Sequence, residues 1–150
     1  MLKLRPHHII DIIRDFGENK TFSPHPYGHA YHIIADVIVK NLNQTIQLVN
    51  CADDICIPCI HLQSNNKCND ILFNHPYSCS KQEYNDYLDK SLLNFLSLEK
   101  DIRISIDDYL NLLLQRIEFF DTIYPHSKEI IDKRKVAFLN GLKKLGIGHG

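Results

Sequence analysis

The chain has 150 residues, of which 44% are hydrophobic and 23% charged, and 17 basic against 18 acidic residues give a formal net charge of −1. This composition is typical of a globular protein, and the length suits a single domain over residues 1–150. The absence of a dense basic run argues against a nucleic-acid partner, and no stretch approaches the ~18 apolar residues of a membrane span. The N-terminus lacks the apolar run of a signal peptide, so we expect a cytoplasmic protein.

Two helices and a strand are predicted in the N-terminal half. Pro6 suits a first helical turn, and the isoleucines that follow it are spaced for a helix that ends at Gly17. A second helix is predicted from about Pro26 to Asn43. The segment TIQLVN (45–50) is rich in β-branched residues and roughly alternating, which predicts a strand that leads directly into the cysteine-rich stretch.

Three further helices are predicted in the C-terminal half. SKQE (80–83) is a capping box that opens a helix through Leu96, and SIDD (105–108) opens another. A last helix is predicted from about Pro125 to Leu145. The sequence therefore predicts a mainly α fold with a minor β element, in which five to six helices surround a cysteine-rich loop.

Four of the five cysteines stand between residues 51 and 68. Cys56 and Cys59 form a C-x-x-C turn, in which two thiolates can converge on one ion, and Cys68 follows after eight residues. In a reducing compartment clustered cysteines are more often metal ligands than disulfides, and this stretch contains few residues that would pack in a core. The pattern predicts a metal site.

Two other roles compete with metal binding. Cysteines can serve as small buried apolar residues. CIPC after a strand also resembles a C-x-P-C redox motif, in which a following helix lowers the pKa of the first thiol; however, IHLQSNNKC makes a poor helix and a βαβ pattern is missing. The metal is open at this point, because tetrahedral zinc takes four N or S ligands and iron–sulfur clusters take mostly thiolates.

LRPHHII (4–10), followed downstream by DDICIPC (53–59) and Cys68, resembles the family labelled domain of unknown function 1284, over residues 2 to about 98. Its members are small bacterial and archaeal proteins suspected of binding an iron–sulfur cluster. The resemblance implies a cluster held by the family's three cysteines close to its histidine pair. In this sequence those positions are Cys56, Cys59, Cys68, His7 and His8.

The chain departs from the family pattern at one position that bears on the fourth ligand. Many members carry a cysteine where this chain has Asp11. The fourth ligand is therefore open among Asp11, Cys51 and Cys79, and a cluster with an open position is a further alternative. We place Cys51 first because it is the nearest additional thiol.

The histidine pair is predicted to handle protons at the metal. His7 and Asp11 stand at i and i+4, and His8 and Asp11 at i and i+3, so on a helix one carboxylate can reach either imidazole. Such a pairing fixes a tautomer and raises basicity, which suits a general base or a metal ligand. His7, His8 and Asp11 are therefore the candidate catalytic residues.

A second histidine stretch falls on the second predicted helix. There His29 is the candidate for binding a cofactor, and the alternative is a solvated stripe. The residues spaced for one helical face are His25, His29, His32 and Asp36. In the cysteine loop, Asp53 and Asp54 are expected to cap the turn by accepting N–H bonds, and Arg5 is expected to pair with one of them.

The sequence thus predicts a metal-binding protein whose first candidate cofactor is an iron–sulfur cluster. Zinc, structural or hydrolytic, is the alternative. An exchangeable iron position would allow chemistry on a small-molecule substrate, whereas a non-catalytic interaction module, or an electron carrier with a redox partner, would need none. No Gly-rich phosphate loop, nucleophile elbow or dinucleotide fingerprint occurs, so the motifs name no substrate.

Overall fold

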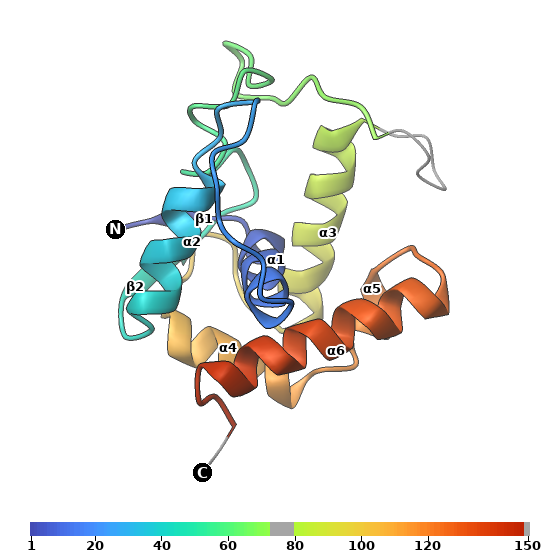
Figure 1. Ribbon diagram of the computed structural model, residues 1–150. Helices are drawn as coiled ribbons and strands as arrows, with labels where there is room; N and C mark the ends of the chain where they lie inside the picture. The colour runs from blue at the N-terminus through green and yellow to red at the C-terminus, as the bar shows by residue number, and fades with distance from the viewer. Residues whose placement is uncertain (73–79, 149–150) are drawn as a thin grey trace.

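The computed structural model describes residues 1–72 and 80–148, and within them the predicted mainly α fold with a minor β element is confirmed. In chain order the elements are β1 (Lys3–Leu4), α1 (Pro6–Gly17), α2 (Tyr31–Lys40), β2 (Thr45–Leu48), α3 (Lys81–Phe95), β3 (Arg103–Ser105), α4 (Ile106–Gln115), α5 (Phe119–Ile123) and α6 (Lys128–Lys144). Figure 1 shows α1 near the centre, with α2 and α3 on either side of it. Among the described helices, none is both long and apolar enough to cross a membrane.

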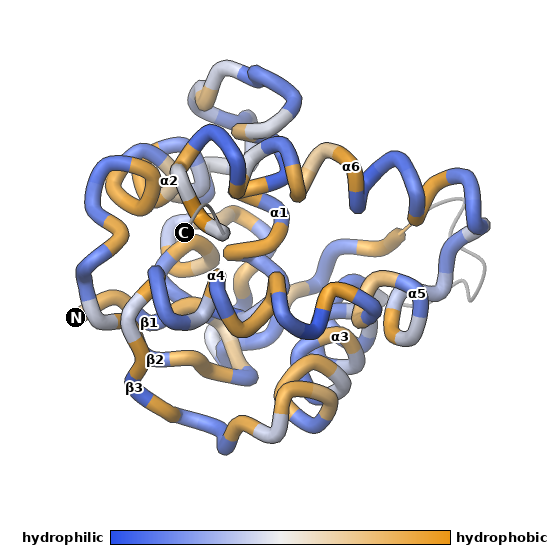
Figure 2. The backbone as a smooth tube through the Cα atoms, turned by 90° about the horizontal axis from the view of Figure 1, so that it is seen from below, coloured by the Kyte–Doolittle hydropathy of each residue, from blue (hydrophilic) through white to orange (hydrophobic). Residues whose placement is uncertain are grey.

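The central helix, α1, is formed and buried as its sequence predicts. Pro6 occupies its first turn, and its four isoleucines, at positions 9, 10, 12 and 13, are buried in the core. α6 crosses α1 closely: a Cβ atom at Gly17 would collide with the Ala137 carbonyl, and one at Gly141 with the Ile13 carbonyl. The two helix backbones are therefore in direct contact, and only glycine allows such a close approach at these positions. Along α6, hydrophobic residues alternate with hydrophilic ones (Figure 2).

The small sheet brings the start of α1 next to the cysteine loop. β2 lies in the middle, parallel to β1 and antiparallel to β3. The Val49 N–H donates to the Leu4 carbonyl and continues the β1–β2 ladder, while on the other side of β1 the Asp54 N–H donates to the Lys3 carbonyl, both over 3.0 Å. Because β1 and β2 are parallel, the segments that follow them leave the sheet at the same end. The histidine pair and the cysteine loop therefore emerge side by side.

The predicted caps open their helices. Ser80 accepts a hydrogen bond from the Glu83 N–H over 3.0 Å, and Ser105 accepts one from the Asp108 N–H over 3.1 Å. A third serine cap, Ser127, was not predicted, and it starts α6 later than Pro125.

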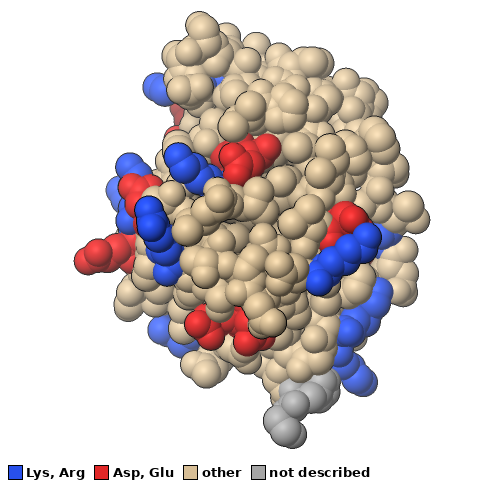
Figure 3. Space-filling model, turned by 90° about the vertical axis from the view of Figure 1, so that its left-hand side faces the viewer, with Lys and Arg blue, Asp and Glu red and all other residues tan. Residues whose placement is uncertain are grey.

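Acidic and basic side chains are interspersed on the face shown in Figure 3.

The prediction for the second helix is wrong at its start. α2 begins at Tyr31 instead of near Pro26, and the preceding residues form turns in which Gly28 has a φ of +75°. A positive φ interrupts a right-handed helix, so His25 and His29 lie before α2. The four polar residues predicted to share one helical face therefore do not do so.

Candidate metal centre

A cavity of about 710 Å³ lies beside the N-terminal end of α1. Its walls come from α1, from α3, from the cysteine loop and from the segment that enters α6. Cys56, Cys59 and Cys68 all line it, together with His7 and His8. The chain thus gathers the three cysteines of the resemblance and the histidine pair around one space.

His8, Asp53 and Cys56 form the tightest group of possible ligands. Their donor atoms all lie within 4.8 Å of one another, and the described residues contain no such group made of three cysteines. Cys59 and Cys68 line the same cavity outside this group. The geometry is therefore that of a candidate metal-binding site with mixed N, O and S donors.

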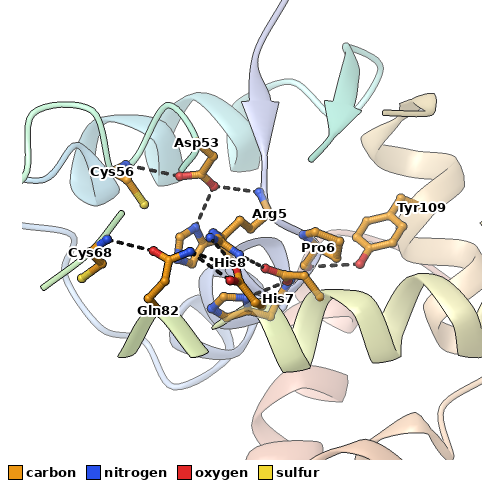
Figure 4. Close-up of polar contacts among 11 residues, drawn as sticks. Arg5, Pro6, His7, His8, Asp53, Cys56, Cys68, Gln82 and Tyr109 are labelled. Atoms are coloured by element: carbon orange, nitrogen blue, oxygen red, sulfur yellow. Dashed lines mark hydrogen bonds and ion pairs between the residues drawn. The ribbon is translucent and has the colours of Figure 1, made fainter. Parts of the chain in front are cut away.

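Asp53 is buried and its carboxylate is fully engaged. Its Oδ1 accepts the backbone N–H groups of Ile55 and Cys56, over 3.1 and 3.2 Å, which confirms the predicted cap for Asp53, whereas Asp54 instead accepts the Lys3 N–H over 2.8 Å. Its Oδ2 accepts the Arg5 N–H over 2.7 Å and lies 2.7 Å from Nδ1 of His8 (Figure 4). Burial alone would raise the pKa of Asp53, but His8 and the N–H donors hold it far below its usual value. Asp53 is therefore an ionised acceptor that orients its neighbours.

His8 is held with one ring nitrogen on Asp53. Burial works to lower the pKa of His8, and the adjacent Asp53 charge outweighs it and raises the pKa. Since an ionised carboxylate only accepts, Nδ1 carries the proton and donates it to Oδ2. Within residues 1–72 and 80–148, Nε2 of His8 has no hydrogen-bond partner. This is the arrangement in which a carboxylate fixes a histidine for metal ligation.

His7 is paired in the same way with a different carboxylate. Its backbone N–H and its Nδ1 both contact Oδ1 of Asp89, at 2.9 and 2.8 Å, and its ring centroid lies 4.4 Å from that of His8. The Arg5 guanidinium donates to Asp89 over 2.8 Å and to Asp86 over 3.1 Å. Burial would raise the pKa of Asp89, yet His7 and Arg5 lower it below its ordinary value.

Two predicted pairings are wrong. The Arg5 side chain pairs with α3, and only its backbone N–H reaches Asp53. Within the described residues Asp11 makes no hydrogen bond to either histidine: it pairs with Arg14 at 3.1 Å, and it acts on His8 only through its charge, which adds to the larger effect of Asp53 in raising the pKa of His8. Asp11 lines the cavity nonetheless, so its part in proton transfer stays a prediction.

Of the remaining predicted ligands that the structure describes, His29 lines the cavity and Cys51 does not. His29 lines the cavity; burial first, and then the charge of His25, lower its pKa. The His29 ring stacks on that of His25, with centroids 4.5 Å apart, and its role as a cofactor ligand stays a prediction. Cys51 is exposed and does not line the cavity. Cys79 lies outside the described residues.

The cysteine loop is tied to α3 by Gln82. The Cys68 N–H donates to Oε1 of Gln82 over 2.8 Å, while Nε2 of Gln82 donates to Asp86. The Asp70 N–H donates to Sγ of Cys68 over 3.4 Å, the kind of contact that stabilises a thiolate. These contacts place Cys68 on the side of the cavity formed by α3.

Cys56 differs from the reactive thiol of a redox pair. Burial, followed by the neighbouring Asp53 charge, raises its pKa to about 12. The residues after it form turns, so no helix N-terminus stabilises a thiolate there. A redox C-x-P-C needs the opposite shift, whereas a metal ion deprotonates a coordinating thiol outright.

No family model, curated protein or solved structure matches this chain.

Several residues of the site were missed in the sequence. Gln82, Asp86 and Asp89 stand at i, i+4 and i+7 and so share the face of α3 toward Arg5. A local signal existed: Asp89 stands between Leu88 and Leu92 in the helical pattern, at a position where an apolar residue is expected. The Tyr109 hydroxyl, which donates to the Pro6 carbonyl over 3.1 Å, gave no such signal.

Proposed function

We propose that this protein binds an iron–sulfur cluster in the cavity, with Cys56, Cys59 and Cys68 as its thiolate ligands. The observation that carries the proposal is that all three cysteines line one cavity of about 710 Å³. A core-filling role for the cysteines would not require them to border a common space. The resemblance to domain of unknown function 1284 points in the same direction.

The spacing of the cysteines favours a cluster over a single zinc ion. Zn–S bonds of ~2.3 Å in a tetrahedron would hold two thiolates about 3.8 Å apart. Within the described part of the chain, no three cysteine sulfurs lie within 4.8 Å of one another. A four-iron cluster is larger than an ion, and each of its thiolates binds a different iron, so it suits the wider arrangement.

Arg5 supplies a further point of fit. Its Nε is buried and has no hydrogen-bond partner among residues 1–72 and 80–148, although the rest of its guanidinium is paired. A buried donor without an acceptor is costly. The sulfurs of a cluster accept hydrogen bonds, and Arg5 lines the cavity, so a bound cluster would supply the missing acceptor.

We further propose His8, through Nε2, as the fourth ligand in place of Cys51. A ring nitrogen of His8 lies within 4.8 Å of the Cys56 sulfur, and Nε2 is the nitrogen that Asp53 leaves available, whereas Cys51 is exposed away from the cavity. Asp11, the other candidate, is engaged by Arg14. Histidine ligands occur in iron–sulfur proteins beside thiolates, and the hydrogen bond to Asp53 sets the required tautomer.

A single zinc ion is the second candidate, because the group of His8, Asp53 and Cys56 is itself compact enough for one ion. When bound, a cluster supplies electron transfer or Lewis acidity, and zinc supplies Lewis acidity alone. With a cluster bound, Asp53 would hold His8, whereas with zinc it would itself be a ligand; in both cases Asp89 holds the neighbouring His7 against the cavity wall.

Metal and sulfide analysis of anaerobically purified protein tests the proposal. We expect iron with matching acid-labile sulfide and broad visible absorption. Replacement of Cys59 with Ala should abolish both, and the matched control Cys51→Ala should retain them. Colourless protein with one zinc per chain would replace the cluster by the second candidate, and protein without any metal would overturn both.

A further inference from the structure

The cavity extends beyond the cysteines to the segment that joins α5 to α6. Ser127, Ile130 and Arg134 line it at i, i+3 and i+7, so one side of the first two turns of α6 faces it. Tyr124 and His126, immediately before α6, line it as well. Figure 1 shows the cysteine loop and the start of α6 approaching α1 and α3 from different sides. The cavity therefore has a wall that takes no part in the metal site.

Among the described residues, Arg134 is the one lysine or arginine of the cavity lining that has no counter-ion. Arg5 pairs with Asp86 and Asp89, and Arg14 and Lys81 also contact carboxylates. Arg134 is half-buried, and in the portions 1–72 and 80–148 it makes neither an ion pair nor a hydrogen bond. A partly buried guanidinium gains most from a planar anionic group that accepts two hydrogen bonds.

Tyr124 is a second, independent sign of a missing partner. Its side chain is only 7% exposed, and its hydroxyl is buried without a hydrogen-bond partner in the described residues. Burial raises the pKa of Tyr124 well above its ordinary value, so the group is an O–H donor. Most buried hydroxyls in proteins are paired, and because Tyr124 is one of the residues that line the cavity, a ligand bound there is the candidate partner for its hydroxyl.

We propose that this wall of the cavity binds the anionic oxygen group, carboxylate or phosphate, of a small molecule, with Arg134 as its counter-ion and Tyr124 as a further donor. The inference deepens the proposed function, and rests on it in one respect: the bound molecule would lie in the same cavity as the metal. The substrate class is then a small organic anion. Binding of the anionic group itself needs no metal.

Titration calorimetry of the anaerobically purified protein tests the proposal, with inorganic phosphate and succinate as separate probes and sodium chloride as the ionic control. We expect one saturable site for at least one probe. Phosphate alone would identify a phosphate ester as the source, and succinate alone a carboxylate. Arg134→Gln should weaken binding by roughly tenfold or more, as loss of a charge-assisted pair predicts.

Lys133→Gln is the matched control, because Lys133 precedes Arg134 on α6, is exposed and does not line the cavity. It should bind within about twofold of the wild type, since exposed charges act weakly. Tyr124→Phe should weaken binding several-fold while the anion-free protein stays as stable. Saturable binding by neither probe, or equal weakening by Arg134→Gln and Lys133→Gln, would overturn the proposal.

Metal analysis of the same samples separates the two proposals. Arg134→Gln should keep the metal and sulfide content of the wild type, because Arg134 is not a ligand. If the wild-type protein contains no metal but binds the anion through Arg134, the cluster fails and the anion site stands. A metal-loaded protein that binds neither probe contradicts the anion site alone.

Discussion

The two ends of α1 differ in what surrounds them. At the C-terminal end, Gly17 and Gly141 let α1 and α6 meet backbone to backbone. At the N-terminal end, Arg5, His7 and His8 are buried or nearly so, and carboxylates from distant segments hold them. Close apolar packing stabilises a fold outright, whereas buried charges are costly unless every partner is present. The first end thus anchors the helix, and the second maintains a polar wall for a ligand.

Removal of one buried charge should have the largest effect. In Asp89→Asn, Arg5 and His7 would lose the buried negative charge that both of them contact; Arg5 is only 1% exposed, and Asp89 is fully buried. We expect a loss of about 3–5 kcal/mol in the free energy of unfolding, measured with urea. The control is Asp86→Asn, whose side chain is 45% exposed and which should lose about 1 kcal/mol or less. Equal losses would show that burial of the pair does not matter.

The second-largest loss of stability should come from overpacking at the C-terminal end of α1. In Gly141→Ala, the new methyl group would collide with the Ile13 carbonyl, and we expect a loss of about 3 kcal/mol with metal content unchanged. Gly146→Ala is the comparison, because open space surrounds Gly146 and only its φ of +76° opposes a side chain. That variant should lose about 1 kcal/mol. A Gly141→Ala protein as stable as the wild type would refute the close crossing of α1 and α6.

Loss of the Asp53 carboxylate, which holds His8, should lower the affinity for the metal without abolishing metal binding. Asp53→Asn keeps the shape of the side chain but no longer fixes the His8 ring as an ionised acceptor. We expect metal affinity to fall by roughly 10–100-fold, measured by competition with a chelator. Asp54→Asn is the control, because among residues 1–72 and 80–148 the Asp54 side chain accepts a hydrogen bond from the Lys3 backbone and from no other group. An unchanged affinity in Asp53→Asn would argue against His8 as a ligand.

The dependence of stability on pH should show the smallest of these effects. The pKa of Asp89 is lowered from its ordinary 3.8, so its contribution is present above that pH and is lost as pH falls through the folded value. We expect the free energy of unfolding to fall at acid pH by roughly 1 kcal/mol for each unit by which the pKa of Asp89 is lowered. The loss should be smaller in Asp89→Asn. Identical acid profiles for the two proteins would contradict the pairing with Arg5 and His7.

The parts of the fold with a local signal were predictable. α1 followed from Pro6, its isoleucines and Gly17, and Ser80 and Ser105 open their helices as their capping patterns indicate. β1, with two residues, and α5, with five, are too short to show a period. The start of α2 was misjudged because Gly28 adopts a positive φ that a helical pattern does not reveal.

In the site, the local part was predictable and the long-range part was not. The spacing of Cys56, Cys59 and Cys68 pointed to one place, and they do line one cavity. The sequence predicted that Asp11, one helical turn along α1, is the carboxylate partner of the histidine pair. Partners more than 40 residues away, Asp53 and Asp89, take that role, and no local pattern connects them to α1.

The most direct test of the account is anomalous diffraction at the iron absorption edge from crystals grown without oxygen. The account predicts an iron peak inside the cavity, bonded to the sulfurs of Cys56, Cys59 and Cys68, with His8 as the remaining ligand. An iron peak bonded to Cys51, a peak at the zinc edge alone, or an ordered cavity without any anomalous signal would contradict it.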